Sequence, residues 1–154
     1  MKVYSVDTSA LIEGWVRAYP IEVFPKLWSG VEQLISTGRL IASAQVRQEL
    51  ERREDELLAW ARQQEGLFQP LDEEVQLAVQ EVMGQFPGLV DIQRQRSTAD
   101  PFVIALAKVR QATVLTQEGY SNRLDKPKIP DVCDALGVPH MKLLELIRTE
   151  GWRF

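Results

Sequence analysis

Short apolar runs alternate with longer amphipathic segments along the whole chain. Three runs are rich in β-branched residues and bounded by polar ones, which predicts strands over residues 2–6, 39–44 and 113–116. The segments between them carry apolar residues at helical spacing. This spacing predicts helices over residues 10–18, 24–36, 45–53, 57–64, 72–86, 97–109 and 141–148, with a short further segment at 129–136.

Strands separated by helices indicate βαβ units, so we expect an α/β fold with a central parallel sheet flanked by helices. A chain of 154 residues fits one domain spanning residues 1–154. Ligands of open parallel sheets bind beyond the carboxyl ends of the strands. Asp7 directly follows the first predicted strand, and Glu118 lies two residues past the third. A site is therefore expected at that edge.

Composition narrows the function classes. The net charge of −4 argues against broad, purely electrostatic nucleic-acid binding. A single cysteine, Cys133, allows no intramolecular disulfide and fits a reducing, cytoplasmic compartment. We expect no signal peptide and no membrane span, because no apolar run approaches about 20 residues. The chain has no P-loop, no Gly-x-Ser-x-Gly elbow and no zinc-type spacing of cysteine and histidine.

Four acidic residues stand out because each lies at a predicted strand end or on a predicted helix. They are Asp7 in VYSVDTSAL, Glu49 in VRQELERR, Asp100 in RSTADPFVIALA and Glu118 in TVLTQEGYS. If the fold gathers them, they form an acidic pocket. Hard divalent cations such as Mg²⁺ or Mn²⁺ prefer such oxygen ligands.

Each acid also has an ordinary structural interpretation. Asp7 can cap the first helix, and Asp100 can complete a capping box and benefit from the helix dipole. Glu49 can pair with Arg53 four residues later on an exposed helix face. Glu118 can be a simple loop residue. None of these acids, taken alone, can therefore be assigned to a structural or a metal-binding role.

Taken together, the four contexts resemble those of PIN-domain ribonucleases, which include the VapC-type toxins. VDTSAL is similar to the first PIN motif, VRQELERR to the second, TADPFVIALA to the third and VLTQE to the fourth. The resemblance spans residues 3–118. The tail segment KIPDVCDALGVPH is similar to a PIN-like subgroup that keeps an Ile-Pro-x-Val-Cys segment.

The resemblance implies a three-layer PIN-like fold and a metal-dependent endoribonuclease. One or two Mg²⁺ or Mn²⁺ ions would be held by the catalytic acids Asp7, Glu49, Asp100 and Glu118. A bound metal lowers the pKa of water and stabilises charge on the scissile phosphate, so no histidine base is needed. The only histidine, His140, is expected to be a surface or turn residue. The resemblance further implies an RNA substrate, a cognate antitoxin protein as partner and a homodimer.

Supporting residues and alternatives remain open from the sequence. Thr8 and Thr116 are candidates to orient the carboxylates, and Asp131 or Asp125 could replace or supplement Glu118, since the fourth acid in the toxins is more often Asp. Basic residues flank two of the acids and could contact RNA phosphates at the rim of the pocket, or could be solvated loop charges. These basic residues are Arg94, Arg96, Arg123, Lys126 and Lys128. The rival functions are a non-catalytic PIN-like binding module and a structure-specific DNA nuclease.

Overall fold

Five short strands form one parallel sheet in the computed structural model, which describes residues 1–90, 99–123 and 125–154. The order across the sheet is β3-β2-β1-β4-β5, and every neighbouring pair is parallel. The strands are β1 (Tyr4–Val6), β2 (Leu40–Ser43), β3 (Phe68–Gln69), β4 (Thr113–Leu115) and β5 (His140–Met141).

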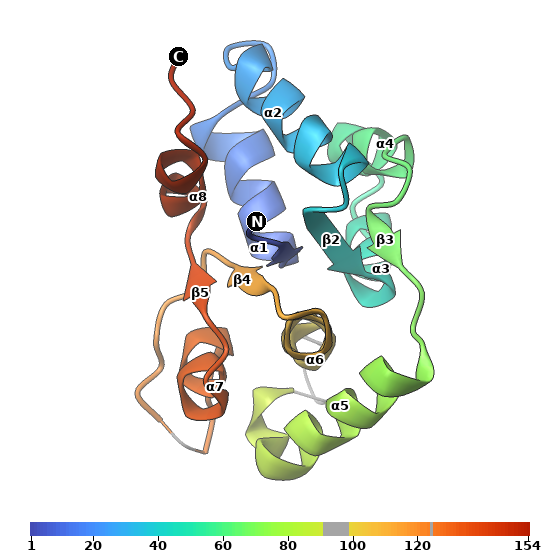
Figure 1. Ribbon diagram of the computed structural model, residues 1–154, viewed down its shortest axis with the longest axis vertical. Coiled ribbons are helices and arrows are strands. Elements are labelled where there is room, and N and C mark those ends of the chain that lie inside the picture. Colours follow the sequence, from blue (N-terminus) through green and yellow to red (C-terminus); the bar gives the residue numbers. More distant parts are fainter. Residues whose placement is uncertain (91–98, 124) are drawn as a thin grey trace.

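Helices cover both faces of this sheet (Figure 1). Helices α5, α6 and α7 lie on one side of it, and α1, α2 and α8 lie on the other. The helices are α1 (Thr8–Ile12), α2 (Pro25–Ser36), α3 (Ala44–Glu51), α4 (Glu56–Arg62), α5 (Glu73–Gln85), α6 (Asp100–Arg110), α7 (Ile129–Leu136) and α8 (Leu143–Glu150). A π-helical segment, η1 (Glu13–Ala18), continues α1, and a 3₁₀ turn, η2 (Pro87–Leu89), follows α5. The predicted α/β fold with a central parallel sheet is confirmed.

The burial of the strands explains why their sequences are apolar apart from small hydroxyl residues and the Tyr4 hydroxyl. All residues of β1, β2 and β4 are buried, as expected for parallel strands covered on both faces. Successive side chains point to opposite layers. Ser5 donates a hydrogen bond to the Val103 carbonyl of α6 (2.9 Å), whereas the Tyr4 hydroxyl donates to Glu150 of α8 (2.5 Å).

Two strands were missed by the sequence prediction. Both β3 and β5 have only two residues, too few to show any periodicity. The last helix was predicted to begin at Met141 but begins at Leu143, because Met141 pairs with Leu115 as a strand residue. His140, expected at a surface or in a turn, lies half-buried on the edge strand β5.

Helix α6 begins at Asp100, while the predicted start at Ser97 lies outside the described residues. The other predicted helices are present, with ends that differ by a few residues from the predicted ones. Among the helices in the described part of the chain, none is long and apolar enough to cross a lipid bilayer.

The strand order creates a point where the chain changes direction across the sheet. From β1 the chain builds outward through β2 to β3, and it then returns to place β4 on the other side of β1. In open α/β sheets, the crevice for a ligand lies at such a switch point, beyond the carboxyl ends of the two central strands. In this protein that place is between the ends of β1 and β4.

Candidate metal centre

Three carboxyl groups converge at the carboxyl edge of the sheet. Asp7, Asp100 and Glu118 each place an oxygen atom within 4.8 Å of the others. Asp7 follows β1, and Glu118 lies on the loop after β4. Asp100 is the first residue of α6, which leads into the amino end of β4, so the start of the helix lies over the carboxyl edge. Residues 7, 100 and 118 are thereby brought together from distant parts of the chain.

Asp7 is held in place by two hydroxyl groups. Its Oδ2 atom accepts hydrogen bonds from Ser9 Oγ (2.6 Å) and from Thr116 Oγ1 (2.9 Å). Asp7 as a whole is 2% exposed. Asp7 has the backbone geometry of a helix N-cap, but its side chain makes no capping bond to α1. The carboxylate is therefore held by hydroxyl groups of α1 and of the segment after β4, and it lies in the cluster of three acids.

The same hydroxyl groups shape the turn that carries Glu118. The Glu118 N–H donates to Thr116 Oγ1 (3.1 Å), and the Gln117 N–H donates to Ser9 Oγ (3.0 Å). The Gln117 side chain accepts from the N–H of Leu143 (2.7 Å), at the start of α8. The loop after β4 is thus tied to both α1 and α8. The sequence pattern Asp-x-Ser was the signal for Ser9, which our prediction did not include among the site residues.

The electrostatics of the cluster disfavour three simultaneous charges. Burial raises the pKa of Asp7, and the charge of Glu49 adds to this effect, while the bonds from Ser9 and Thr116 oppose it. Burial, followed by the charge of Asp7, raises the pKa of Glu118 to about 7. Buried like charges raise one another's pKa unless a cation compensates them. The cluster is therefore suited to a positive ligand.

Glu49 lies beside the cluster rather than in it. Thr8 donates a hydrogen bond to Glu49 Oε1 (2.5 Å), which joins the start of α1 to α3. The negative charge of Glu49 raises the pKa of both Asp7 and Glu118, so Glu49 lies close to the cluster. Its predicted alternative partner, Arg53, pairs instead with Asp55 (2.8 Å). Glu49 is thus placed to act as a fourth acid at the edge of the site.

Asp131 has a structural role in the loop that precedes α7. Its carboxylate accepts from the Ser121 N–H (2.9 Å), the Ser121 hydroxyl (2.7 Å) and the Lys128 N–H (2.8 Å). These bonds close the loop onto the first turn of α7, and they lower the pKa of Asp131. Asp125 forms an ion pair with Arg123 (2.6 Å). Neither aspartate belongs to the cluster of three.

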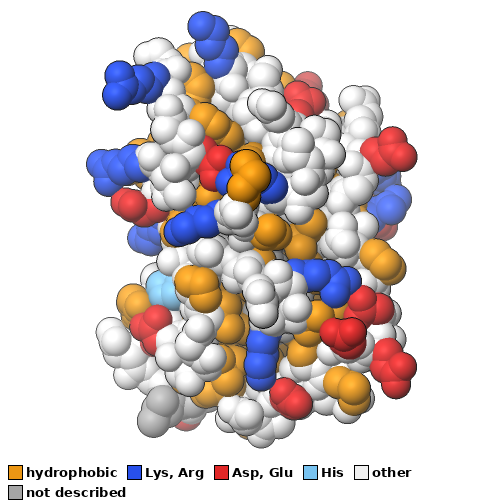
Figure 2. Space-filling view, in the orientation of Figure 1, with side chains coloured by type: hydrophobic (Ala, Val, Ile, Leu, Met, Phe, Trp, Pro, Cys, Tyr) orange, Lys and Arg blue, Asp and Glu red, His pale blue; other side chains and the backbone are white. Residues whose placement is uncertain are grey.

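The structure describes only some of the candidate basic residues. Arg94 and Arg96 lie outside the described residues. Lys126 and Lys128 are exposed, and the charge of Lys128 lowers the pKa of Glu118, so Lys128 lies near the pocket. The face seen in Figure 2 carries basic and acidic side chains intermixed. That face has no broad basic surface, in agreement with the net charge of −4.

The donor set fits a hard cation. Carboxylate oxygens from three residues, with a fourth acid alongside, are the ligand type that Mg²⁺ and Mn²⁺ prefer, and the cluster contains no thiolate or imidazole that would favour a softer metal. The raised pKa values of Asp7 and Glu118 mean that a bound divalent ion would also relieve repulsion. The three carboxyl groups can therefore hold a divalent metal.

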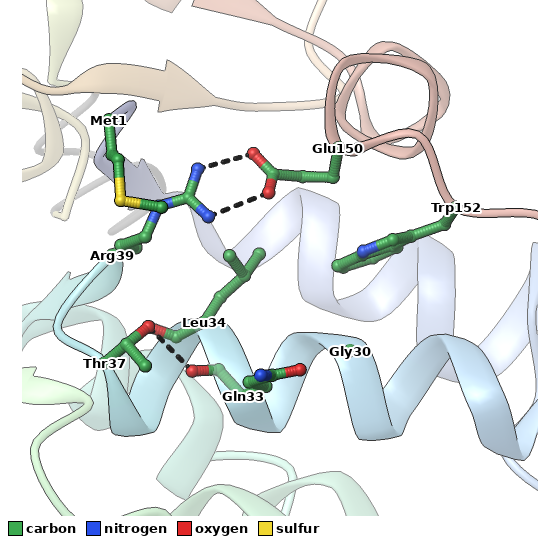
Figure 3. Close-up of a pocket in the computed structure, with 8 residues that line it drawn as sticks. All are labelled: Met1, Gly30, Gln33, Leu34, Thr37, Arg39, Glu150 and Trp152. Carbon is green, nitrogen blue, oxygen red and sulfur yellow. Dashed lines mark hydrogen bonds and ion pairs between the residues drawn. The ribbon is translucent and has the colours of Figure 1, made fainter.

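A separate surface pocket lies at the opposite end of the sheet (Figure 3). It encloses about 330 Å³, and it is lined in part by Met1 and Arg39, which precede β1 and β2. The Arg39 guanidinium forms two hydrogen bonds with Glu150 (2.9 and 2.7 Å). The charges of Arg39 and Glu150 are therefore paired with each other, and neither is left free to bind a ligand in this pocket.

A comparison with protein-family models assigns the chain to one family. The model of the family described as "Domain of unknown function (DUF4411)" matches residues 4–154. The chain belongs to the DUF4411 family. No curated protein matches it.

Among solved structures, the chain is similar to the structure of FitAB bound to an IR36 DNA fragment. The TM-score is 0.56 at 18% identity, and the match covers 91% of this chain and 94% of the other. FitAB has a PIN-like fold, and the fold of this DUF4411 chain is therefore PIN-like.

Proposed function

We propose that this chain is a metal-dependent endoribonuclease that hydrolyses RNA phosphodiester bonds. The observation that carries the proposal is the convergence of the Asp7, Asp100 and Glu118 carboxyl groups within 4.8 Å at the switch point of a PIN-like sheet. Glu49 lies close to these acids and completes the set of four. All four acids come from the contexts that resemble the PIN motifs.

The roles of the residues follow from their positions. Asp7, Asp100 and Glu118 would hold Mg²⁺ or Mn²⁺, with Glu49 at the edge. When bound, such an ion lowers the pKa of water and stabilises negative charge on the phosphate. Thr116 and Ser9 hold the Asp7 carboxylate in one orientation through their hydroxyl groups. Thr8 does the same for Glu49.

Substrate contacts would come from the basic residues near the pocket. Lys128 is exposed and close enough to lower the pKa of Glu118, which supports a contact with an RNA phosphate. Lys126 follows on the same loop, and Arg123 would have to leave its ion pair with Asp125 to contribute. Such contacts position the strand and do not read its sequence.

We further propose a biological role as the toxin of a toxin–antitoxin pair, neutralised by a cognate antitoxin and acting as a homodimer. The motif resemblance to VapC-type toxins and the fold shared with FitAB support this role. FitAB was solved with a DNA fragment, so DNA is a substrate to be tested beside RNA.

The test is a side-by-side cleavage assay on single-stranded RNA and branched DNA with increasing Mn²⁺. We expect cuts in RNA that depend on Mn²⁺ and stop when EDTA is added. Preferential cleavage of branched DNA would favour a DNA nuclease. Binding of RNA without any cleavage at saturating Mn²⁺ would favour a non-catalytic module.

A further inference from the structure

Within the described residues, one buried hydroxyl group at the carboxyl edge of the sheet has no hydrogen-bond partner. Ser43 is the last residue of β2 and is 5% exposed, and its Oγ atom makes no hydrogen bond within the described part of the chain. Unpaired buried polar atoms are uncommon in native proteins, and they often contact an ordered water or an ion. The position of Ser43 indicates which kind of partner it would have.

The strand register relates the position of Ser43 to that of Asp7. Tyr4 lies opposite Leu40 and Ser5 lies opposite Ile41 in the parallel pair of β1 and β2. The paired residues end there, and Asp7 and Ser43 each come two residues further along the chain. Neighbouring strands in a sheet are about 4.8 Å apart. Asp7 and Ser43 therefore both lie at the carboxyl edge, at the ends of neighbouring strands.

The alternation of side chains places both residues on the same face of the sheet. Ser5, two residues before Asp7, points to α6 through its bond to the Val103 carbonyl. Ile41, two residues before Ser43, packs in the cluster that includes Leu106 of α6. Side chains two residues apart share a face. Ser43 and Asp7 thus both point to the side of the sheet where α6 begins with Asp100.

We propose that Ser43 is a positioning residue of the metal centre, whose hydroxyl accepts a hydrogen bond from a water molecule bound to the divalent cation. This inference rests on the proposed function, because the cation is the same. Mg²⁺ and Mn²⁺ prefer oxygen ligands, and Mg²⁺ in particular keeps several of its waters in protein sites. Outer groups that hold such ligands contribute to metal affinity although they do not touch the ion.

A purely structural Ser43 would behave differently when the hydroxyl is removed. Ser43→Ala deletes an unpaired buried polar atom, so the metal-free protein should keep or gain stability. Only a hydroxyl that contacts the hydration shell of the metal should also change metal affinity. Ser43→Cys provides a second variant, since it keeps nearly the same volume but replaces the hydroxyl with a weaker hydrogen-bonding group.

The experiment is calorimetric titration of Mn²⁺ into wild type, Ser43→Ala, Ser43→Cys and a control, Ser5→Ala. Ser5 is a fully buried serine on the same face, and its hydroxyl already donates to the Val103 carbonyl of α6. We expect affinity to fall about tenfold or more in both Ser43 variants. Affinity should be unchanged in Ser5→Ala, and the metal-free melting temperature of the Ser43 variants should not fall.

Two results would overturn the inference in distinguishable ways. Equal Mn²⁺ affinity in wild type and both Ser43 variants would show that the hydroxyl takes no part in the site, and it would leave the proposed function standing. Failure of the wild type to bind Mn²⁺ would overturn the proposed metal centre itself, and this inference with it.

Discussion

Glu118 is the residue whose protonation should be visible in the stability of the whole protein. Its pKa is about 7 in the fold, against an ordinary value of 4.5. At a pH between these two pKa values, the folded chain binds more protons than the unfolded chain does. This carboxyl therefore makes the metal-free protein less stable as the pH rises from about 4.5 to about 7. Saturating Mn²⁺ should oppose this loss, because the ion favours the charged carboxylate.

Thermal melts of metal-free wild type and Glu118→Gln between about pH 5 and about pH 8 measure this effect. We expect the melting temperature of the wild type to fall more steeply with pH than that of the variant. Identical pH profiles for the two proteins would contradict a raised pKa at Glu118.

Asp7→Asn should affect stability differently in the absence and in the presence of metal. Asp7→Asn removes a buried charge but keeps a carbonyl oxygen able to accept from Ser9 and Thr116. The metal-free variant should therefore unfold at a higher temperature than the wild type, because burial already disfavours the charge that the substitution removes. Mn²⁺ should raise the melting temperature of the wild type and have much less effect on the variant.

Asp72→Asn is a suitable control for these melts. Asp72 caps α5 by accepting from the Val75 N–H (2.9 Å), and it pairs with Arg110 (2.8 Å), outside the cluster of three acids. The control should lose stability without metal but keep the full Mn²⁺ shift. Equal Mn²⁺ shifts in wild type and Asp7→Asn would argue strongly against the site.

At the residue scale, the sequence indicated the acids but not their grouping. Asp7 and Glu118 could be placed at one edge because each follows a strand, and Asp100 because it opens a helix. The separation of Glu49 from the other three depends on its bond to Thr8 and on the path of α3, which no local pattern encodes. Asp131 was also ambiguous, because a first-turn acid serves equally well as a ligand and as an anchor for backbone N–H groups.

Among the elements, α2 depends on a glycine where the C-terminal segment packs against it. A Cβ atom added at Gly30 would lie 2.8 Å from the Trp152 ring. Gly30→Ala should therefore displace Trp152 and lower the unfolding free energy by about 1 kcal/mol. The measurement is urea denaturation monitored by tryptophan fluorescence.

Gly84 in α5 provides the matched control for this substitution. A Cβ atom there meets nothing within 4 Å, so Gly84→Ala should raise the unfolding free energy by roughly 0.5–1 kcal/mol through helix propensity alone. Changes of the same sign in both variants would contradict the close packing of Trp152 on α2.

The longer elements were predictable because their side chains repeat. Helix α2 and helix α5 show helical spacing over 12 and 13 residues, and the buried strands β1 and β4 are uniformly apolar apart from small hydroxyl residues. The two-residue strands β3 and β5 form only because longer strands offer them a partner. Met141 was assigned to a helix for that reason, since its strand pairing is a long-range contact.

For the molecule as a whole, alternation of strands and helices was enough to predict the class of fold but not the order of the strands. The arrangement β3-β2-β1-β4-β5 places β4 beside β1, although more than 100 residues separate them in sequence. This long-range pairing brings Thr116 and Glu118 to Asp7 and so creates the cluster. The resemblance to PIN domains provided the three-layer arrangement that periodicity alone could not.

The central claim is that these acids form the metal-dependent centre of a ribonuclease, and cleavage of single-stranded RNA with Mn²⁺ tests it most directly. The comparison uses wild type, Asp7→Asn, Asp100→Asn and Glu118→Gln, each shown to be folded by its thermal melt. We expect cleavage to be abolished in the two aspartate variants and reduced less in Glu118→Gln. Folded Asp7→Asn protein that cuts RNA at the wild-type rate would contradict the account.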